Sequence, residues 1–249
     1  MNEYLKSLKK IEFVVTYECS GRCKHCFQGS HDGCVGSIDT ALAVDAVRRV
    51  AGEYPIETVM TFGGESLLYP DTVCEIHRAA REMGVPRRQL ITNGFFTTNV
   101  QEMDALASRL AECGVNDVLI SADAFHQEHI PTSVVYRFIG SLRKHGIPVR
   151  ISPAWLVSRD DVNEYNVRTR EVLDMLSDLD VPVCEGNVIY PEGNAMVYLG
   201  EYFDTGAPLN PYVEDPYDVR CLSFEPDGTV LGANAREKDI MEIIRDYKP

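Results

Sequence analysis

Short apolar runs alternate with amphipathic segments along most of the chain. Residues 11–17 (IEFVVTY) form an apolar, β-branched run that predicts a strand. Between residues 42 and 51 the apolar side chains recur at helical spacing with charged residues between them, which indicates a helix with one buried face. Residues 58–62 (TVMTF) predict a second strand, which ends at a Gly-Gly-Glu sequence. The chain therefore begins with a strand, a helix and a strand.

The same alternation then repeats at a regular interval. Helical segments end near Gly84, Gly114, Gly146 and Asp180, which lie 30 to 34 residues apart. This interval is the length of one βα unit. The apolar runs that follow are residues 90–92, 118–121, 149–152 and 183–189. Because strands and helices alternate, we expect an α/β fold with a parallel sheet. Six strands are too few for a closed eight-stranded barrel, so we predict a partial (β/α)6 TIM-like barrel.

The pattern changes after about residue 200. Residues 204–216 contain three prolines and little periodicity, which predicts a loop. Residues 220–225 and 229–231 flank a Pro-Asp-Gly turn and predict a small hairpin, and residues 237–247 predict a short helix. We therefore expect a barrel domain over residues 1–200 and a C-terminal extension, a hairpin followed by a helix, over residues 201–249.

Composition and charge narrow the possible functions. The 249 residues are 45% hydrophobic, which is enough to form a packed core, and they carry a net charge of -14. An acidic chain is a poor match for a phosphate backbone, so we expect no nucleic-acid partner. No run approaches the length of a membrane span, and the first residues do not resemble a signal peptide. We expect a cytoplasmic protein without a membrane partner, whose eight cysteines stay reduced.

Three cysteines lie close together in the loop after the first strand. Cys19, Cys23 and Cys26 are spaced C-x3-C-x2-C. Three thiolates in one short loop suit an iron–sulfur cluster, and as ligands of a [4Fe–4S] cluster they leave one iron without a protein ligand. The alternative is a zinc site, although zinc ligands usually come as two separated pairs. In that case the fourth ligand would be His25, His31 or Cys34.

This motif after the first strand of a βα chain resembles the signature of the radical S-adenosylmethionine (SAM) enzymes. The resemblance implies that Cys19, Cys23 and Cys26 bind one [4Fe–4S] cluster and that SAM chelates the fourth iron. In that family an electron from the cluster cleaves SAM, and the resulting 5′-deoxyadenosyl radical takes a hydrogen atom from the substrate. We expect a small-molecule or short-peptide substrate and a reductant such as flavodoxin or ferredoxin. The alternative is a zinc- or cluster-stabilised binding or scaffold protein without catalytic activity on the same fold.

Other segments carry the resemblance through about the first 200 residues. Gly63, Gly64 and Glu65 resemble the family's GGE segment, which implies contact with the methionyl part of SAM. His25 stands where the family usually has an aromatic residue near the adenine. Ser121 and Asp123 are candidates for the ribose hydroxyls, with helix capping as the alternative. Further candidate SAM contacts after the third, fifth and sixth strands are Asn93, Ser152 and Pro191.

The remaining cysteines predict a single cluster. The segment around residues 220–231 resembles the opening hairpin of a SPASM or twitch extension, but the cysteines of an auxiliary cluster are missing, so this extension is truncated. Cys74 and Cys113 lie among apolar residues in helices and are expected in the core. Some family members return a hydrogen atom to the substrate radical from a cysteine. We therefore name Cys221 as a candidate hydrogen donor, on the expectation that it lies near the barrel mouth.

Overall fold

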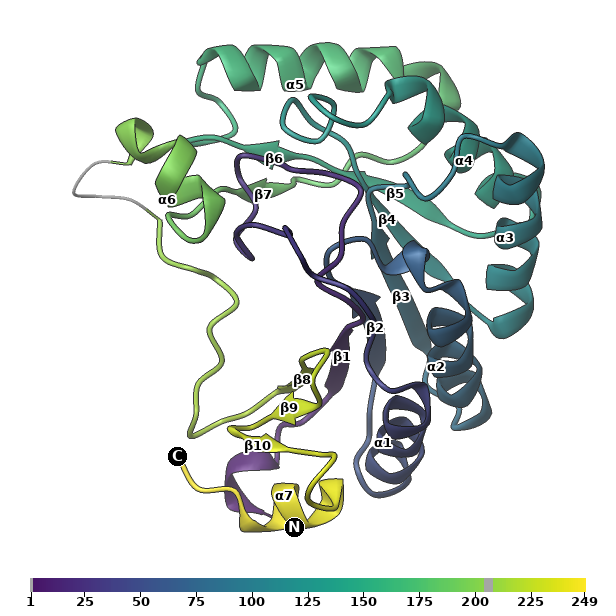
Figure 1. The fold of residues 1–249 in the computed structure, drawn as a ribbon, viewed down its shortest axis with the longest axis vertical. Coiled ribbons are helices and arrows are strands. Elements are labelled where there is room, and N and C mark those ends of the chain that lie inside the picture. The colour runs from purple at the N-terminus through teal and green to yellow at the C-terminus, as the bar shows by residue number, and fades with distance from the viewer. Residues whose placement is uncertain (1, 204–207) are drawn as a thin grey trace.

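The computed structural model describes residues 2–203 and 208–249, and its centre is one curved parallel sheet (Figure 1). Six strands form it in the order β5-β4-β3-β2-β1-β8. Their bounds are β1 Lys10–Val14, β2 Thr58–Phe62, β3 Arg87–Thr92, β4 Asp117–Ser121, β5 Val149–Ser152 and β8 Cys221–Phe224. Every neighbouring pair in this sheet is parallel. The predicted partial barrel of α/β class is confirmed.

Five helices cover the convex side of the sheet and follow its curve (Figure 1). They are α1 Thr40–Glu53, α2 Pro70–Glu82, α3 Val100–Cys113, α4 Thr132–Lys144 and α5 Glu164–Met175. Local signals set their ends: the carboxylate of Asp39 caps α1 by accepting from Leu42 N, and Gly114 ends α3 in the left-handed conformation. The regular interval of the sequence is thus the interval of successive strand–helix units.

Short elements complete the described part of the chain. They comprise β6 Ala154–Trp155, β7 Asn187–Val188, α6 Asn194–Tyr198, β9 Thr229–Val230, β10 Ala233–Asn234, α7 Ile240–Asp246 and 3-10 turns at Glu3–Leu5, Ser66–Leu68, Ser177–Leu179 and Gly200–Tyr202. The loop predicted over residues 204–216 lies partly outside the described residues, since 204–207 are not described. From 208 to 218 it contains no helix or strand.

The sixth strand of the sheet is not the one that the sequence predicts. In residues 183–189, Val183 makes an isolated bridge to Ile151, and only Asn187–Val188 forms a strand, which pairs with β6 outside the main sheet. Gly186 interrupts the run: its φ is 81°, and a Cβ there would lie 2.3 Å from the carbonyl oxygen of Pro153. The sixth position is taken by β8, which pairs with β1.

The predicted C-terminal hairpin is also rearranged. The Pro-Asp-Gly turn is present, with Gly228 N donating to Glu225 O, but the antiparallel pair is β9 with β10 and does not include β8. Burial explains the difference, because Leu222 and Phe224 alternate towards the core and the Phe224 ring stacks on Phe13 with centroids 5.0 Å apart. This apolar face is covered only if β8 joins the main sheet.

One apolar core fills the space between the sheet and its helices, and the C-terminal segment contributes to it. Strand residues alternate, so that Val118 and Ile120 of β4 pack outwards against the helices while Ser121 does not. Leu222 and Ile243 from the last thirty residues belong to this same core. The division into domains 1–200 and 201–249 stays a prediction.

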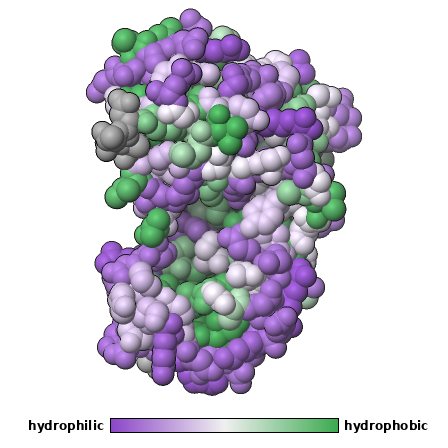
Figure 2. Space-filling model, turned by 60° about the vertical axis from the view of Figure 1, so that its left-hand side comes forward, coloured by the Kyte–Doolittle hydropathy of each residue, from purple (hydrophilic) through white to green (hydrophobic). Residues whose placement is uncertain are grey.

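The concave side of the sheet is open between β8 and the β6–β7 pair (Figure 1). Figure 2 shows this side turned forward, with a hollow between the upper and lower parts of a largely hydrophilic surface. The segment from residue 208 to β8 passes along this opening (Figure 1), and there Tyr212 donates from its hydroxyl to the Asn187 side chain at 2.5 Å. No helix in the described ranges is long and apolar enough to cross a membrane.

Candidate functional site

The three cysteines of the motif lie in the loop that leaves the carboxyl end of β1. Backbone turns fold this loop onto itself, with Cys26 N donating to Cys23 O and Gly29 N donating to Cys26 O, both at 3.2 Å. Cys23 is buried, while Cys19 and Cys26 are half-buried. Burial raises the pKa of the Cys19 thiol to about 12 and also raises the pKa of Cys23 and Cys26. A positively charged centre is therefore needed to hold them as thiolates.

The spacing of the three sulfurs tests which metal group they fit. Ligands on one zinc ion, with Zn–S bonds of about 2.3 Å, lie about 3.8 Å apart. The three sulfurs are not within 4.8 Å of one another, and the described residues hold that arrangement only in Cys23, His25 and His126. Three thiols in one loop that are too widely spread for a single ion fit a polynuclear cluster.

Gly63 and Gly64 follow β2 and run directly against the start of the cysteine loop. Gly64 N donates to Thr16 O, and Glu65 N donates to Glu18 O, both at 2.8 Å. A Cβ on Gly64 would lie 2.2 Å from Glu18 O, and one on Gly63 would lie 2.5 Å from Thr16 O. Only glycine permits this approach, and at Gly63 the φ of 141° adds a second reason. The glycines therefore lock the loop to β2, beside the candidate ligand site.

Glu65 is a structural tie between two strand ends. Its carboxylate is fully buried and accepts from Leu67 N at 2.8 Å, Thr92 Oγ1 at 2.7 Å and Asn93 N at 2.8 Å. Burial raises its pKa, although these hydrogen bonds act in the opposite direction. The carboxylate thereby holds the end of β3 at the end of β2.

Asn93 points from β3 into the cysteine loop. Its side-chain NH2 donates to Ser20 Oγ at 3.3 Å and lies 3.7 Å from Cys19 Sγ, while its carbonyl accepts from Phe95 N. The side-chain NH2 of Asn93 thus lies against the loop that carries the three thiols.

Asp123 holds a histidine pair beside Cys23. Its buried carboxylate accepts from Phe125 N and Ala154 N at 3.0 Å and from His126 Nδ1 at 2.9 Å. Burial disfavours its charged form, but His126 and the N–H donors more than offset this and lower its pKa. No helix begins at Asp123, so it is not a helix cap; its oxygens accept from the N–H groups of a turn and from Ala154 N. A ribose contact of Asp123 stays untested.

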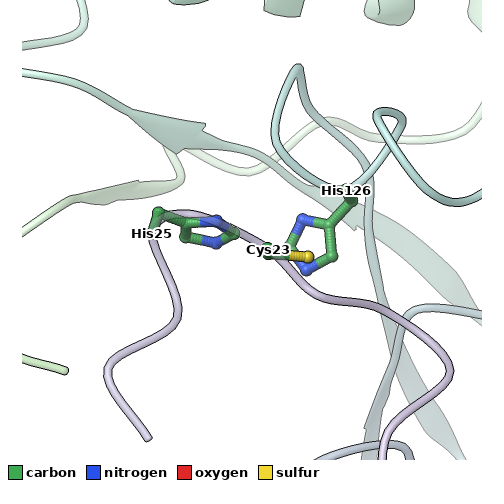
Figure 3. Close-up of side chains that lie close together, drawn as sticks. All are labelled: Cys23, His25 and His126. Carbon is green, nitrogen blue, oxygen red and sulfur yellow. The ribbon is translucent and has the colours of Figure 1, made fainter. Parts of the chain in front are cut away.

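His25 is enclosed by two rings. The rings of Phe125 and His126 pack against it, with centroids 4.9 Å and 4.8 Å away. Figure 3 shows His25, Cys23 and His126 gathered in one place. His25 Nδ1 is buried and has no partner among the described residues, and burial lowers the pKa of this imidazole to about 4. His25 is a neutral ring with one unused nitrogen.

Two hydroxyls lie together at the same end of the sheet. Ser121 ends β4 and Ser152 ends β5, and the two residues are paired in the parallel register. Both side chains are half-buried, and neither hydroxyl has a hydrogen-bond partner within the described parts of the chain. They are free to bind a ligand with adjacent hydroxyl groups.

The segment from Pro191 onward reaches the cysteine loop from the far end of the barrel. Asn194 N donates to Cys26 O at 2.9 Å, and the Asn194 side chain donates to Cys23 O at 3.1 Å. A Cβ on Gly193 would lie 2.3 Å from Phe27 O. Asn194 thus fixes the backbone that carries two of the three thiols.

Cys221 does not lie at the barrel mouth, which corrects its expected position; its role as a hydrogen donor stays a prediction. It begins β8 and pairs in register with Lys10, the first residue of β1, whereas the cysteine loop follows the last residue of that strand. Parallel strands place these positions on opposite edges of the sheet. Cys74 and Cys113 are buried in the main core, as expected.

The sequence analysis missed two contributions to the site. The partnership of His126 with Asp123 was detectable from their spacing of three residues after a strand end. Lys24, between two motif cysteines, forms an ion pair with Glu128 at 3.1 Å and lies over the Tyr165 ring. Nothing local in the sequence marks that contact, because the partners are 104 residues apart.

Comparisons with known proteins agree with this geometry. A family model described as the radical SAM superfamily matches residues 13–194. A probable GTP 3',8-cyclase from Methanocaldococcus jannaschii is 24% identical over 127 residues, covering 51% of this chain and 40% of that protein. The corresponding protein of Metallosphaera sedula is 28% identical over 128 residues, covering 51% and 38%. The chain thus spans about two-fifths of the length of these curated relatives.

Solved structures share the fold. The structure of anSMEcpe with bound AdoMet has a TM-score of 0.62 and 15% identity, with coverage of 95% of this chain and 80% of that one. Streptococcus suis SuiB bound to S-adenosylmethionine has a TM-score of 0.61 and 12% identity, with coverage of 96% and 66%. At these identities the likeness concerns the fold.

Proposed function

Since this chain belongs to the radical SAM superfamily, we propose that it is an enzyme that cleaves SAM reductively and abstracts a hydrogen atom from a small-molecule or short-peptide substrate. The superfamily uses a [4Fe–4S] cluster and SAM, which together supply one-electron cleavage chemistry when bound. The observation that carries the proposal is the family match over residues 13–194, which includes the three thiols; their sulfurs, not all within 4.8 Å of one another, fit the cluster that this family uses.

The residues of the site divide into ligands and supports. Cys19, Cys23 and Cys26 hold the cluster. Gly63 and Gly64 bring the end of β2 against the cysteine loop, beside the place expected for the methionyl group of SAM. The SAM-binding roles of these glycines rest on the family resemblance and on their place beside the loop.

The supporting roles follow from the contacts. Glu65 fixes the ends of β2 and β3, and Asn93 orients the loop at Cys19. Asp123 acts through His126, which packs against His25 near the place expected for the adenine. The Pro191 segment holds the loop from the opposite side through Asn194.

Ser121 and Ser152 are the proposed ligands of the ribose hydroxyls. They are adjacent on parallel strands, and their hydroxyls have no hydrogen-bond partner among the residues described. A ribose presents two neighbouring hydroxyls, so two serines on neighbouring strands suit it. Of the candidates named from the sequence after β4, Ser121 fits this role better than Asp123, whose oxygens already accept protein hydrogen bonds.

The hollow on the open side is the proposed entrance for substrate (Figure 2). Its position between β8 and β7 leaves the carboxyl ends of the strands accessible from the side. The names of similar proteins include a cyclase of GTP and enzymes solved with peptides, which supports either a small molecule or a short peptide. We further propose a cytoplasmic protein that takes its electron from flavodoxin or ferredoxin.

Anaerobic reconstitution tests the proposal. The full chain, reconstituted with iron and sulfide, should be brown with about four irons per chain and should release 5′-deoxyadenosine after addition of dithionite and SAM. Cys19→Ser should lose both properties, whereas Cys34→Ser, a matched change in the same loop, should keep both.

Three results would contradict the proposal. A brown wild-type protein that never cleaves SAM supports the non-catalytic alternative on the same fold. A colourless protein that holds zinc and takes up no iron supports the zinc alternative. About eight irons per chain would overturn the single cluster.

A further inference from the structure

A second set of metal-binding atoms shares one cysteine, Cys23, with the cluster motif. The sulfur of Cys23, one ring nitrogen of His25 and one of His126 all lie within 4.8 Å of one another (Figure 3). Ligands on one zinc ion, at about 2.0–2.3 Å from it, lie about 3.3–3.8 Å apart. Movements of about 1 Å by side chains therefore suffice to close this set around one ion.

His126 is oriented as metal-binding histidines usually are. Its Nδ1 is hydrogen-bonded at 2.9 Å to Asp123, whose carboxylate is itself buried and held by backbone N–H groups. A histidine that donates one N–H to a carboxylate presents its other nitrogen, here Nε2, as a metal ligand. This carboxylate–histidine arrangement is present before any metal binds.

His25 supplies an independent observation. Its Nδ1 atom is buried and has no hydrogen-bond partner among the described residues, which is a costly state for a polar atom. The ring cannot turn freely, because Phe125 and His126 pack against it. A metal ion between His25, His126 and Cys23 would give one of its nitrogens a partner.

We propose that the cluster-free chain binds one divalent ion of the zinc class through Cys23, His25 and His126, with water as the fourth ligand. One sulfur and two imidazoles form a ligand set typical of zinc. On binding, the Cys23 thiol releases its proton to solvent and the sulfur bonds to the metal. Because Cys23 also belongs to the cluster motif, the zinc-class ion and the cluster exclude one another.

Cobalt is the probe for the site. Anaerobic titration of the cluster-free full chain with Co²⁺ should give the visible absorption of a tetrahedral ion and a thiolate charge-transfer band, at one ion per chain, and Zn²⁺ should abolish both. His126→Gln should weaken binding at least tenfold, and Asp123→Asn about 10–100-fold through the orientation of His126.

Cys19→Ser is the matched control, because Cys19 belongs to the cluster motif but not to this set. It should bind cobalt as the wild type does. Loss of binding in Cys19→Ser with retention in His126→Gln would overturn the proposal and assign the ion to the cysteines. Absence of any one-to-one cobalt site in the wild type would overturn it too. Thermal unfolding curves of His126→Gln and Asp123→Asn show whether a loss of cobalt binding comes from a variant that is no longer folded.

The competition gives a second measurement. Zinc added before iron and sulfide should reduce cluster formation in the wild type, and His126→Gln should resist this effect. Equal inhibition in both proteins would place the inhibiting ion elsewhere and contradict the proposal. The test does not depend on the proposed enzymatic function, since the release of 5′-deoxyadenosine is measured separately on the iron-loaded protein.

Discussion

At the amino-terminal edge of the sheet, polar side chains satisfy one another, while at the carboxyl-terminal edge several are left without partners. Asp117, at the start of β4, accepts from Arg87 and Gln89 at 2.7 Å and from Arg150 at 2.7 and 2.8 Å. At the end of the same strand, the Ser121 hydroxyl has no partner among the described residues, and neither does Nδ1 of His25 in the cysteine loop.

This difference between the two edges indicates that polar groups at one edge stabilise the sheet, whereas those at the other are available to bind a ligand. Both carboxylate oxygens of Asp117 already accept hydrogen bonds from protein groups, so they are not available to a ligand. Its two arginines also neutralise the charge of the carboxylate. Unused hydroxyls, thiols and a ring nitrogen carry a desolvation cost that a bound ligand can repay. We therefore place the proposed function at the carboxyl-terminal edge, where the active sites of βα barrels lie.

The largest expected effect is that of Gly64→Ala. The added Cβ would lie 2.2 Å from Glu18 O, so the loop must move, and we expect a loss of about 1–3 kcal/mol in the free energy of unfolding. We also expect SAM affinity, measured by equilibrium dialysis, to fall at least tenfold, because the loop carries the thiols.

Gly140→Ala is the matched control within α4. Nothing lies within 4 Å of its added Cβ, and alanine favours a helix, so this change should stabilise the protein by about 0.5–1 kcal/mol and leave SAM affinity unaltered. If the two substitutions had equal effects, the close packing of Gly64 against the loop would not be what sets SAM affinity.

A smaller and different effect is expected of Asp117→Asn. The arginines keep fewer charge-assisted partners but can reach water, so about 1–2 kcal/mol of stability should be lost at neutral pH, measured by urea unfolding. The release of 5′-deoxyadenosine per reduced cluster should be unchanged. A variant that stays folded but loses SAM cleavage would break the proposed separation of the two edges.

The same variant has a defined pH dependence. Burial disfavours the ionised form of Asp117, but its hydrogen bonds with Arg150 and Arg87 outweigh this and lower its pKa below the ordinary 3.8. Its contribution to stability is therefore complete above that value and is lost as the pH falls through the lower pKa of the folded state. The difference in stability between wild type and variant should shrink below about pH 3.8.

The smallest effect is expected of Cys221→Ala. This residue pairs with Lys10 at the amino-terminal edge, so we expect normal SAM cleavage and a stability change of about 1 kcal/mol or less. The measurement is 5′-deoxyadenosine release with and without a candidate substrate. A selective loss of substrate turnover would show that this edge takes part in the reaction.

Local patterns in the sequence predict the parts of this molecule that depend on neighbouring residues. The first five strands and their helices follow from apolar periodicity, and the three thiols from a spacing within eight residues. The partnership of β8 with β1 is different, because residues 10 and 221 meet only in the folded chain. The alternation of apolar residues at Leu222 and Phe224 can be read from the sequence, but the strand with which this segment pairs cannot.

The candidate site shows the same division. The positions of Cys19, Cys23, Gly64 and Ser121 near one edge follow from motif and strand order. The roles of Glu65 and Asp123 do not follow from these patterns. A carboxylate that comes after a strand can bind a ligand or accept from backbone N–H groups, and the sequence does not distinguish the two roles. Burial decides between these roles, and it depends on residues such as Thr92 and Ala154 from other strands.

The contacts of Asn194 have a consequence for the order of events during synthesis. This residue donates to Cys23 O and Cys26 O, although 171 residues separate it from Cys23. A ribosome must therefore have released most of the chain before the cysteine loop can acquire its final support. We expect stable metal loading to be a late, post-translational event, so that nascent chains that end before residue 194 expose the thiols without retaining a metal group.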